Sequence, residues 1–294
     1  MQRISSAPLS IPANRTSLER MQCMEVWGGN HCVERSIQTA GLDIWVYSRP
    51  YGQAVGGGDV HYLSSCASGR ITRMLLADVS GHGEVVSQLA MGLRDLMRRN
   101  INYVKQARFV RTMNKQFTEY AEKGCFATAL VSTFFAPTKT FTLCSAGHHA
   151  PLLFDESTSQ WSELKGEAGE SHVATDIPLG IVGDACYSQL AIKLQAGDMV
   201  LSYSDAIIES TDEDGRQLGE AGILKLVREL DLQEPDQVIP AIVESITALA
   251  GNNLEQDDAT ILLCRATGSG PSLKNNLLAP FRFFGPVKDR TSLD

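Results

Sequence analysis

The chain has 294 residues, of which 43% are hydrophobic and 20% are charged, and its formal net charge is −8 at pH 7. This length allows one large domain with extensions or two small domains, and it is enough to bury a sizeable core. The acidic balance argues against a nucleic-acid backbone as the main partner, because phosphate binding needs clustered lysine and arginine. It also suits a protein that holds cations.

Targeting and cysteine signals indicate the compartment. The amino-terminal stretch MQRISSAPLSIPANR lacks the apolar run of a secretory signal, and the chain has no continuous apolar window of membrane-spanning length. The seven cysteines are odd in number and contain no CxxC pair, which excludes a disulfide framework or a zinc-knuckle pattern. We therefore expect a cytoplasmic protein with no membrane segment.

The two ends of the chain differ in pattern from its middle. Residues 1–16 are polar and contain two prolines, so we expect them to be loose. Residues 17–28, SLERMQCMEVWG, are expected to form a short helix that ends at the following glycines. The stretch from about residue 267 opens with Gly, Ser and Pro and contains an apolar patch, LLAPFRFFGP, that we expect to dock on the rest of the protein.

Between these ends, the predicted strands come in blocks and the predicted helices come in pairs. Apolar runs predict strands at residues 43–47, 60–63, 71–78, 127–135, 141–146, 151–154, 189–194, 199–204 and 259–264. Apolar residues at helical spacing predict two helices, one through Val86, Leu89, Leu93 and Leu96 and one through Val110, Met113, Phe117 and Tyr120. A second pair is expected near 219–230 and 236–250. This order lacks strict βαβ alternation, so it predicts the α+β class, with sheet packed on sheet and helices outside.

Four aspartates lie where a predicted strand meets a turn. Asp59 follows a glycine run in AVGGGDVHYL, and Asp78 ends a strand in LLADVSGHG. Asp205 ends a strand in VLSYSDAIIES, and Asp257 opens the last strand in EQDDATILLC. Carboxylates gathered in one place repel one another unless hard cations such as Mg²⁺ or Mn²⁺ neutralise them. Each aspartate alone is more typical of a turn residue, and the spacing does not show whether the four converge.

The ordered motifs GGD, DVSGHG, SAGHHAPLLF, PLGI, GDMVLSYSDAIIES and DDATILL resemble those of the PPM (type 2C) metal-dependent serine/threonine protein phosphatases. Within that family they are most similar to the bacterial SpoIIE/RsbU branch. The resemblance covers about residues 41–266 and implies two packed antiparallel sheets flanked by helix pairs, an αββα sandwich. It divides the chain into a partly helical amino-terminal extension (1–40), a phosphatase domain (41–266) and a carboxy-terminal tail (267–294).

The resemblance also implies a site that holds two Mn²⁺ or Mg²⁺ ions. Asp78 would bridge the two ions, and the carbonyl of Val79 would bind one of them. Asp205 and Asp257 would complete the other side, and Asp59 would act directly or through a metal-bound water. Two such cations lower the pKa of a shared water, which attacks the phosphorus of phosphoserine or phosphothreonine, and they offset charge on the phosphoryl oxygens.

The implied substrate is a phosphorylated protein, typically an anti-sigma-factor antagonist in a signal-transduction pathway. A regulatory protein partner or a homodimer is the expected means of control. Two departures from the family pattern keep an alternative open, namely a catalytically impaired phosphoprotein-binding module of the same fold. Ala206 stands where glycine usually follows the aspartate, and Tyr62 stands where an acidic residue is common. A hydrolase for small phosphoesters is a further alternative.

Several other residues have competing interpretations. His82 is a candidate catalytic residue that protonates the leaving serine oxygen, or it is a histidine that hydrogen-bonds its own turn. For His148 and His149 we expect structural roles, and for Arg49 a solvated loop position rather than a phosphate contact. The stretch CASGR has too few residues between cysteine and arginine for a cysteine-phosphatase loop, so we expect Cys66 at a turn or strand end.

Overall fold

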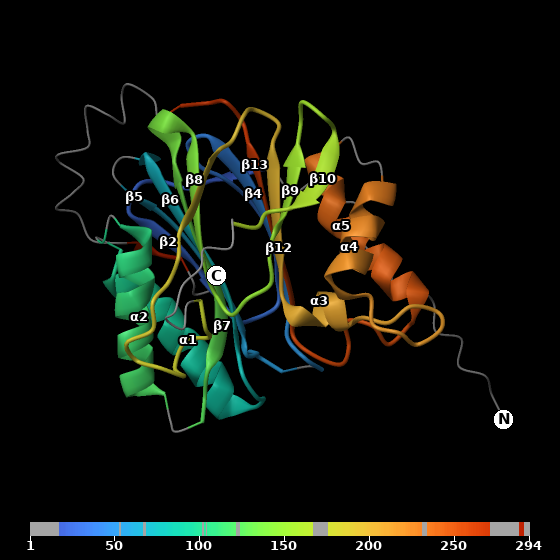
Figure 1. Ribbon diagram of the computed structural model, residues 1–294, viewed down its shortest axis with the longest axis horizontal. Coiled ribbons are helices and arrows are strands. Elements are labelled where there is room, and N and C mark those ends of the chain that lie inside the picture. Colours follow the sequence, from blue (N-terminus) through green and yellow to red (C-terminus); the bar gives the residue numbers. More distant parts are fainter. Residues whose placement is uncertain are drawn as a thin grey trace.

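The computed structural model describes residues 288–290 and residues 18–270, the latter apart from positions 53, 67–68, 102, 104, 122–123, 167–175 and 231–233. Two seven-stranded sheets pack face to face, and each carries helices on its outer face (Figure 1). The predicted α+β sandwich is therefore confirmed. None of the helices in the described part of the chain is long and apolar enough to cross a membrane.

The first sheet has the strand order β1-β3-β4-β13-β12-β9-β10. Its strands are antiparallel except at one edge, where β1 runs parallel to β3. The bounds are β1 Glu19–Arg20, β3 Val33–Gln38, β4 Leu42–Arg49, β9 Leu152–Asp155, β10 Gln160–Glu163, β12 Met199–Tyr203 and β13 Ala259–Ala266.

The second sheet has the order β11-β8-β7-β6-β5-β2-β14. It is likewise antiparallel except where β14 runs parallel to β2 at its edge. The bounds are β2 Glu25–Gly29, β5 Asp59–Cys66, β6 Ile71–Val79, β7 Ala127–Phe135, β8 Thr140–Ala146, β11 Leu190–Lys193 and β14 Lys288–Asp289.

The helices cover the two outer faces in separate groups. The helices α1 (Glu84–Arg99) and α2 (Gln106–Tyr120) lie over the second sheet, and α4 (Gly219–Glu229) and α5 (Pro235–Leu249) lie over the first (Figure 1). The short helix α3 (Asp205–Glu209) follows β12 directly, and a 3-10 turn, η2 (Ala136–Thr138), follows β7. The apolar face predicted for α1 is buried, which confirms that amphipathic spacing placed this helix on the sheet.

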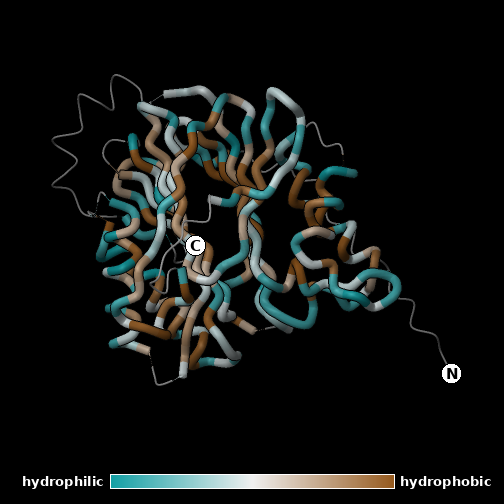
Figure 2. The backbone as a smooth tube through the Cα atoms, viewed as in Figure 1, coloured by the Kyte–Doolittle hydropathy of each residue, from teal (hydrophilic) through white to brown (hydrophobic). Residues whose placement is uncertain are grey.

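Three apolar clusters correspond to the layers. One fills the space between the sheets, and the other two lie between each sheet and its helices. The strands β2, β5, β6, β12 and β13 carry hydrophobic residues on both faces and are buried along most of their length. Figure 2 shows hydrophobic residues along the strands of both sheets. Because both faces of each sheet are covered, the ends of the strands are the places where polar groups reach solvent.

The expected helix over residues 17–28 is wrong, because this stretch forms β1 and β2. Val26 belongs to the cluster on the helix side of the second sheet, whereas Trp27 belongs to the cluster between the sheets. Adjacent apolar residues that point to opposite faces fit a strand in the interior of a sandwich, and this pairing overrides a weak helix preference. Strands β3 and β10 were also not predicted.

The predictions for the two ends of the chain have different outcomes. Strands β1 to β3 pair into the two sheets, and the division of the chain at residues 41 and 266 stays a prediction. The expected loose segment at 1–16 and the apolar patch LLAPFRFFGP lie outside the described residues. At the carboxy-terminal end, Lys288 and Asp289 form β14 beside β2.

Candidate metal centre

The four predicted aspartates come from two strand pairs, one pair in each sheet. Asp59 begins β5 and Asp78 lies near the end of β6, while Asp205 follows β12 and Asp257 precedes β13. Because the strands of each pair are antiparallel, the start of one strand and the end of its neighbour lie at the same end of the sheet. The Asp258 carboxylate, next to Asp257, accepts hydrogen bonds from the backbone N–H groups of Gly58 and Asp59, so the two pairs meet at one end of the sandwich.

The two carboxylates of the second sheet are direct neighbours. Asp59 and Asp78 are cross-strand partners, so their side chains share one face of the sheet. On β5, Leu63 lies four residues after Asp59, and on β6, Met74 lies four residues before Asp78. Both apolar side chains belong to the cluster between the sheets. The alternation of a strand therefore directs both carboxylates toward the first sheet.

The first sheet meets them with hydroxyls and two further carboxylates. The Ser204 hydroxyl accepts a hydrogen bond from the Thr260 backbone N–H at 2.9 Å and lies 3.3 Å from the Asp258 carbonyl oxygen, to which it donates. These bonds tie the end of β12 to the start of β13. They hold Asp205, one residue beyond Ser204, and Asp257, one residue before Asp258, at the mouth of the space between the sheets.

Asp258 braces the loop that leads to Asp59. Its carboxylate accepts hydrogen bonds from the backbone N–H groups of Tyr51 at 2.6 Å, Gly58 at 2.5 Å and Asp59 at 3.4 Å. Asp258 is buried and directly precedes β13 of the first sheet, whereas Gly58 and Asp59 lie at the start of β5 in the second. A single carboxylate thus fixes how the two sheets approach each other at this end.

The glycine run is needed because atoms from other segments approach its backbone closely. A Cβ on Gly57 would lie 2.2 Å from the Asp258 carboxylate, and a Cβ on Gly58 would lie 2.8 Å from the carbonyl oxygen of Val79. Glycine at these positions lets Asp258 bond the loop and keeps the Val79 carbonyl beside Asp59. The Val79 carbonyl is the predicted main-chain ligand.

The raised pKa of Asp59 shows that this arrangement disfavours its charged form. Asp59 is 3% exposed, and burial, followed by the charge of Asp78, holds its pKa well above the usual range. The Ser204 and Thr260 hydroxyls lie close enough to counteract part of this rise, yet neither carboxylate oxygen of Asp59 accepts a hydrogen bond of normal geometry.

Its neighbours behave in the same way. Burial, followed by the charges of Asp205 and Asp257, raises the pKa of Asp78 to about 7. Partial burial is also the main cause that raises the pKa of Asp257, with the charge of Asp205 acting in the same direction. The carboxylates therefore lie close enough to disfavour one another's charge.

Glu209 is an acidic residue of the site that the sequence analysis missed. Its pKa is raised, first by burial and then by the charges of Asp205 and Asp257. It lies four residues after Asp205, so the two share one face of α3. That spacing was a usable signal, because an acidic residue at i+4 from a candidate ligand on a helix faces the same way.

The donor set fits hard divalent cations. Both oxygens of Asp59 are buried without hydrogen-bond partners, and the surrounding groups are carboxylates, a carbonyl and hydroxyls, which are the ligands of Mg²⁺ and Mn²⁺. Cations would also relieve the repulsion that raises the carboxyl pKa values. Within the described residues, no three His, Cys, Asp or Glu side chains already converge to ligand spacing, so binding requires the carboxylates to draw together.

His82 lies at the rim of the site. It is exposed in the turn between β6 and α1, and its charge favours the ionised form of Asp257. This places the side chain opposite the first sheet, at the solvent side of the carboxylates. Both interpretations of His82, as a proton donor or as a turn residue, are compatible with that position, and its catalytic role stays a prediction.

The two histidines of the AGHHAP turn lie behind the carboxylates. His148 is buried, with Nδ1 3.0 Å from the Thr128 hydroxyl and Nε2 3.0 Å from the Tyr203 carbonyl oxygen. The expected structural role of His148 is confirmed, because these contacts connect β7 in one sheet with β12 in the other. The ring of His149 stacks on Tyr203 with centroids 5.8 Å apart, near Asp205.

The two departures from the family pattern lie outside the carboxylate cluster. Tyr62 is fully buried in the apolar cluster beneath α1 and α2, on the opposite face of β5 from Asp59. Ala206 is buried in the cluster between the first sheet and its helices. Arg49 forms a 3.5 Å ion pair with Glu255 at the surface, in agreement with a solvated position. Cys66 ends β5, as predicted.

Comparison with known proteins gives one family and one curated relative. The family model described as Stage II sporulation protein E (SpoIIE) matches residues 68–267. The protein "Phosphoserine phosphatase RsbU" of Bacillus subtilis (strain 168) is 24% identical over 230 residues, which make up 78% of this chain and 64% of that protein. This chain therefore spans less than two thirds of that relative's length.

Two solved structures share the fold. The RsbU and RsbW domains of Rv1364c from Mycobacterium tuberculosis match with a TM-score of 0.64 and 22% identity, over 82% of this chain and 64% of that one. The PP2C phosphatase domain of SpoIIE from Bacillus subtilis, with a fragment of its regulatory domain, matches with a TM-score of 0.65 and 14% identity, over 80% and 64%. At these identities the likeness establishes the fold.

Proposed function

Because the chain belongs to the SpoIIE family, in the SpoIIE/RsbU branch of the PPM (type 2C) phosphatases, we propose that it is a metal-dependent protein serine/threonine phosphatase. The observation that carries the proposal is the pair Asp59 and Asp78. They are cross-strand neighbours, Asp59 buried and Asp78 half-buried, and burial together with neighbouring carboxylates raises the pKa values of both. Such a pair costs stability unless a cation neutralises it, and such a cost is typical of a functional site.

Five groups would hold two divalent cations, Mn²⁺ or Mg²⁺. They would be the carboxylates of Asp59, Asp78, Asp205 and Asp257 and the main-chain carbonyl of Val79. Cations held there activate a water for attack on a phosphate ester and offset the negative charge of the phosphoryl group.

The chain itself would contribute position and proton transfer. Asp258 holds the backbone of Gly58 and Asp59 against the first sheet, so the carboxylates keep their orientation as charge accumulates. His82, exposed at the rim, is the candidate donor of a proton to the leaving serine or threonine oxygen. This donor role requires a readout separate from cation binding, such as the pH dependence of kcat.

The proposed substrate is a phosphoserine or phosphothreonine in a protein, and within that class an anti-sigma-factor antagonist. The family supports this choice, as does the likeness to a protein described as a phosphoserine phosphatase. A solved relative that carries RsbU and RsbW domains in one protein supports a regulatory protein partner. A homodimer is the other proposed means of control, and the cytoplasm is the proposed location.

The experiment is hydrolysis of phosphopeptides and of p-nitrophenyl phosphate by the full chain, with and without Mn²⁺. We expect Mn²⁺-dependent release of phosphate that Asp78→Asn and Asp205→Asn abolish. Asp214→Asn is the matched control, because Asp214 is an exposed aspartate whose ion pair with Arg216 lies at the surface. Tight phosphopeptide binding without turnover would instead support the binding module, and faster turnover of small phosphoesters than of phosphopeptides would support the small-substrate hydrolase.

A further inference from the structure

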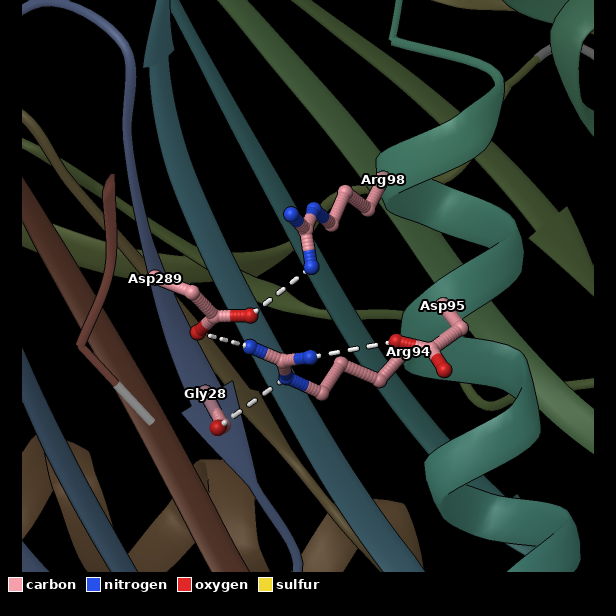
Figure 3. Close-up of polar contacts among 5 residues, drawn as sticks. All are labelled: Gly28, Arg94, Asp95, Arg98 and Asp289. Carbon is pink, nitrogen blue, oxygen red and sulfur yellow. Dashed lines mark hydrogen bonds and ion pairs between the residues drawn. The ribbon is translucent and has the colours of Figure 1, made fainter. Parts of the chain in front are cut away.

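Helix α1 and strand β2 are joined along one polar seam. Arg94, on α1, is 3% exposed, and its Nε donates to the carbonyl oxygen of Gly28 on β2 at 3.3 Å (Figure 3). Seven residues earlier, and therefore on the same side of the helix, Ser87 meets Asn30, the residue that follows β2. These contacts extend along α1 from Arg94, near its middle, to Ser87, in its first turn. That turn follows Val79 closely in the chain.

The carboxy-terminal residues Lys288, Asp289 and Arg290, which we call the C-terminal strap, lie along this seam. The strap continues the second sheet: the Lys288 N–H donates to the Met24 carbonyl at 2.9 Å, and the Arg290 N–H donates to the Val26 carbonyl at 2.9 Å. These bonds satisfy the edge of β2, whose backbone groups would otherwise be unpaired.

The strap also neutralises two buried charges. The Asp289 carboxylate pairs with Arg94 and, at 3.1 Å, with Arg98, both on α1 (Figure 3). The Arg290 guanidinium pairs at 3.0 Å with Glu25 on β2, which is 1% exposed. A buried charge whose partner is removed is strongly destabilising, because its desolvation is no longer offset. Opposite charges on α1 and β2 are therefore each matched by the strap.

The seam reaches the carboxylate site through Asn30. Its side-chain amide donates to the carbonyl of Gly57 at 2.8 Å, to the Ser87 hydroxyl at 2.7 Å and to the Ser87 carbonyl at 3.1 Å. The backbone carbonyl of Asn30 accepts a hydrogen bond from the Gly57 N–H at 2.8 Å. Asn30 is 6% exposed. It therefore fixes the first turn of α1 against the glycine run that precedes Asp59.

We propose that the C-terminal strap is a latch that holds α1 and the glycine run in the arrangement that binds the cations, with Arg94 and Asn30 as positioning residues. This rests on the proposed function of the carboxylate site. When the strap leaves, the buried Arg94 and Glu25 side chains lose the counter-charges of Asp289 and Arg290, and Arg94 keeps its 3.2 Å ion pair with Asp95. Helix α1 then loosens along β2, and Asn30 no longer holds Gly57 in register with Asp258 and Asp59.

The test is amide hydrogen exchange and calorimetric Mn²⁺ binding on the full chain, with Asp289→Asn as the variant. A hydrogen bond to a charged group contributes enough for about a tenfold effect when its charge is removed. We expect about tenfold faster exchange in α1 and at residues 56–59, unchanged exchange in α5, and about five- to tenfold weaker Mn²⁺ binding.

Two further variants distinguish a latch from general destabilisation. Asp214→Asn removes the same charge from an exposed ion pair and leaves α1 exchange and Mn²⁺ affinity unchanged. The combined effect of Arg94→Met and Asp289→Asn is smaller than the sum of the two single effects, because Asp289 pairs with Arg94, and the part that remains reports the exposed pair of Asp289 with Arg98. Equal acceleration in α1 and α5, or faster α1 exchange with unchanged Mn²⁺ affinity, overturns the proposal.

These readouts do not depend on turnover. If the wild-type chain binds Mn²⁺ but hydrolyses no phosphate ester, the proposed function fails, and the exchange and affinity measurements still test the strap. If Asp289→Asn leaves both unchanged in an active enzyme, the strap proposal fails and the proposed function stands.

Discussion

The two sheets contribute to the same site in different ways. The second sheet supplies Asp59 and Asp78 from paired strands, where burial raises both pKa values. The first sheet supplies Asp205 from the start of a short helix and Asp257 from an exposed turn. The Asp59–Asp78 pair is fixed by strand register but costs stability, whereas the Asp205–Asp257 pair is more accessible. The proposed function, which brings cations and a phosphoprotein to one site, needs both properties.

The largest expected effect comes from removing one carboxylate of the Asp59–Asp78 pair. Asp78→Asn keeps the shape of the side chain but removes the charge that the cations require, so we expect about a thousandfold loss of kcat, equivalent to about 4 kcal/mol. Asp257→Asn, at the exposed side, should lose less, about tenfold to a hundredfold. Steady-state kinetics on one phosphopeptide at saturating Mn²⁺ compares the two variants. Equal losses would contradict the division of roles between the sheets.

A free energy of similar size should appear as a pH-dependent change in the stability of the metal-free protein. The pKa of Asp78 rises from 3.8 to about 7 on folding, so the folded state holds its proton more tightly. The resulting stability is complete below about pH 4 and is lost as the pH rises to about 7, by about 4 kcal/mol at most. Asp78→Asn lacks this loss. Its Tm in EDTA should therefore exceed that of the wild type increasingly between pH 4 and 7, and a constant difference would contradict the assignment.

The close approach of Gly58 to Val79 gives a smaller effect. In Gly58→Ala the new Cβ lies 2.8 Å from the Val79 carbonyl oxygen, so the carbonyl or the loop must move. We expect about 1 to 3 kcal/mol of lost stability and weaker Mn²⁺ binding. Gly251→Ala is the control, because no atom lies within 4 Å of its added Cβ. Thermal denaturation and calorimetry measure both quantities, and equal behaviour of the two variants would remove the close-approach argument.

Glu209 should give the smallest change. Glu209→Gln removes one charge from the exposed side of the site without removing a proposed ligand, so we expect about a threefold decrease in Mn²⁺ affinity and little change in kcat at saturating Mn²⁺. Mn²⁺ titrations of activity measure both values. A loss of kcat as large as that of Asp257→Asn would instead indicate that Glu209 binds a cation directly. The first sheet would then supply one more ligand than proposed.

Features that depend on local periodicity could be predicted from the amino-acid sequence. Strand alternation and helical spacing predicted β5, β6, α1 and α2, and the ends of the strands marked the four aspartates. These patterns are local because the side-chain direction of a strand or helix repeats every few residues. The same rule makes Glu209 detectable as the i+4 neighbour of Asp205, although the motif order alone did not point to it.

Features that depend on distant partners could not be predicted from local patterns. Residues 25–29 form a strand because both faces of the sheet to which β2 belongs are covered by apolar layers. Tyr62 lies in the core because it occupies the face of β5 opposite Asp59. The pairing of Asp289 with Arg94, nearly two hundred positions apart, has no local signal. Burial and charge compensation are properties of the packed chain, so a sequence specifies them only through the fold.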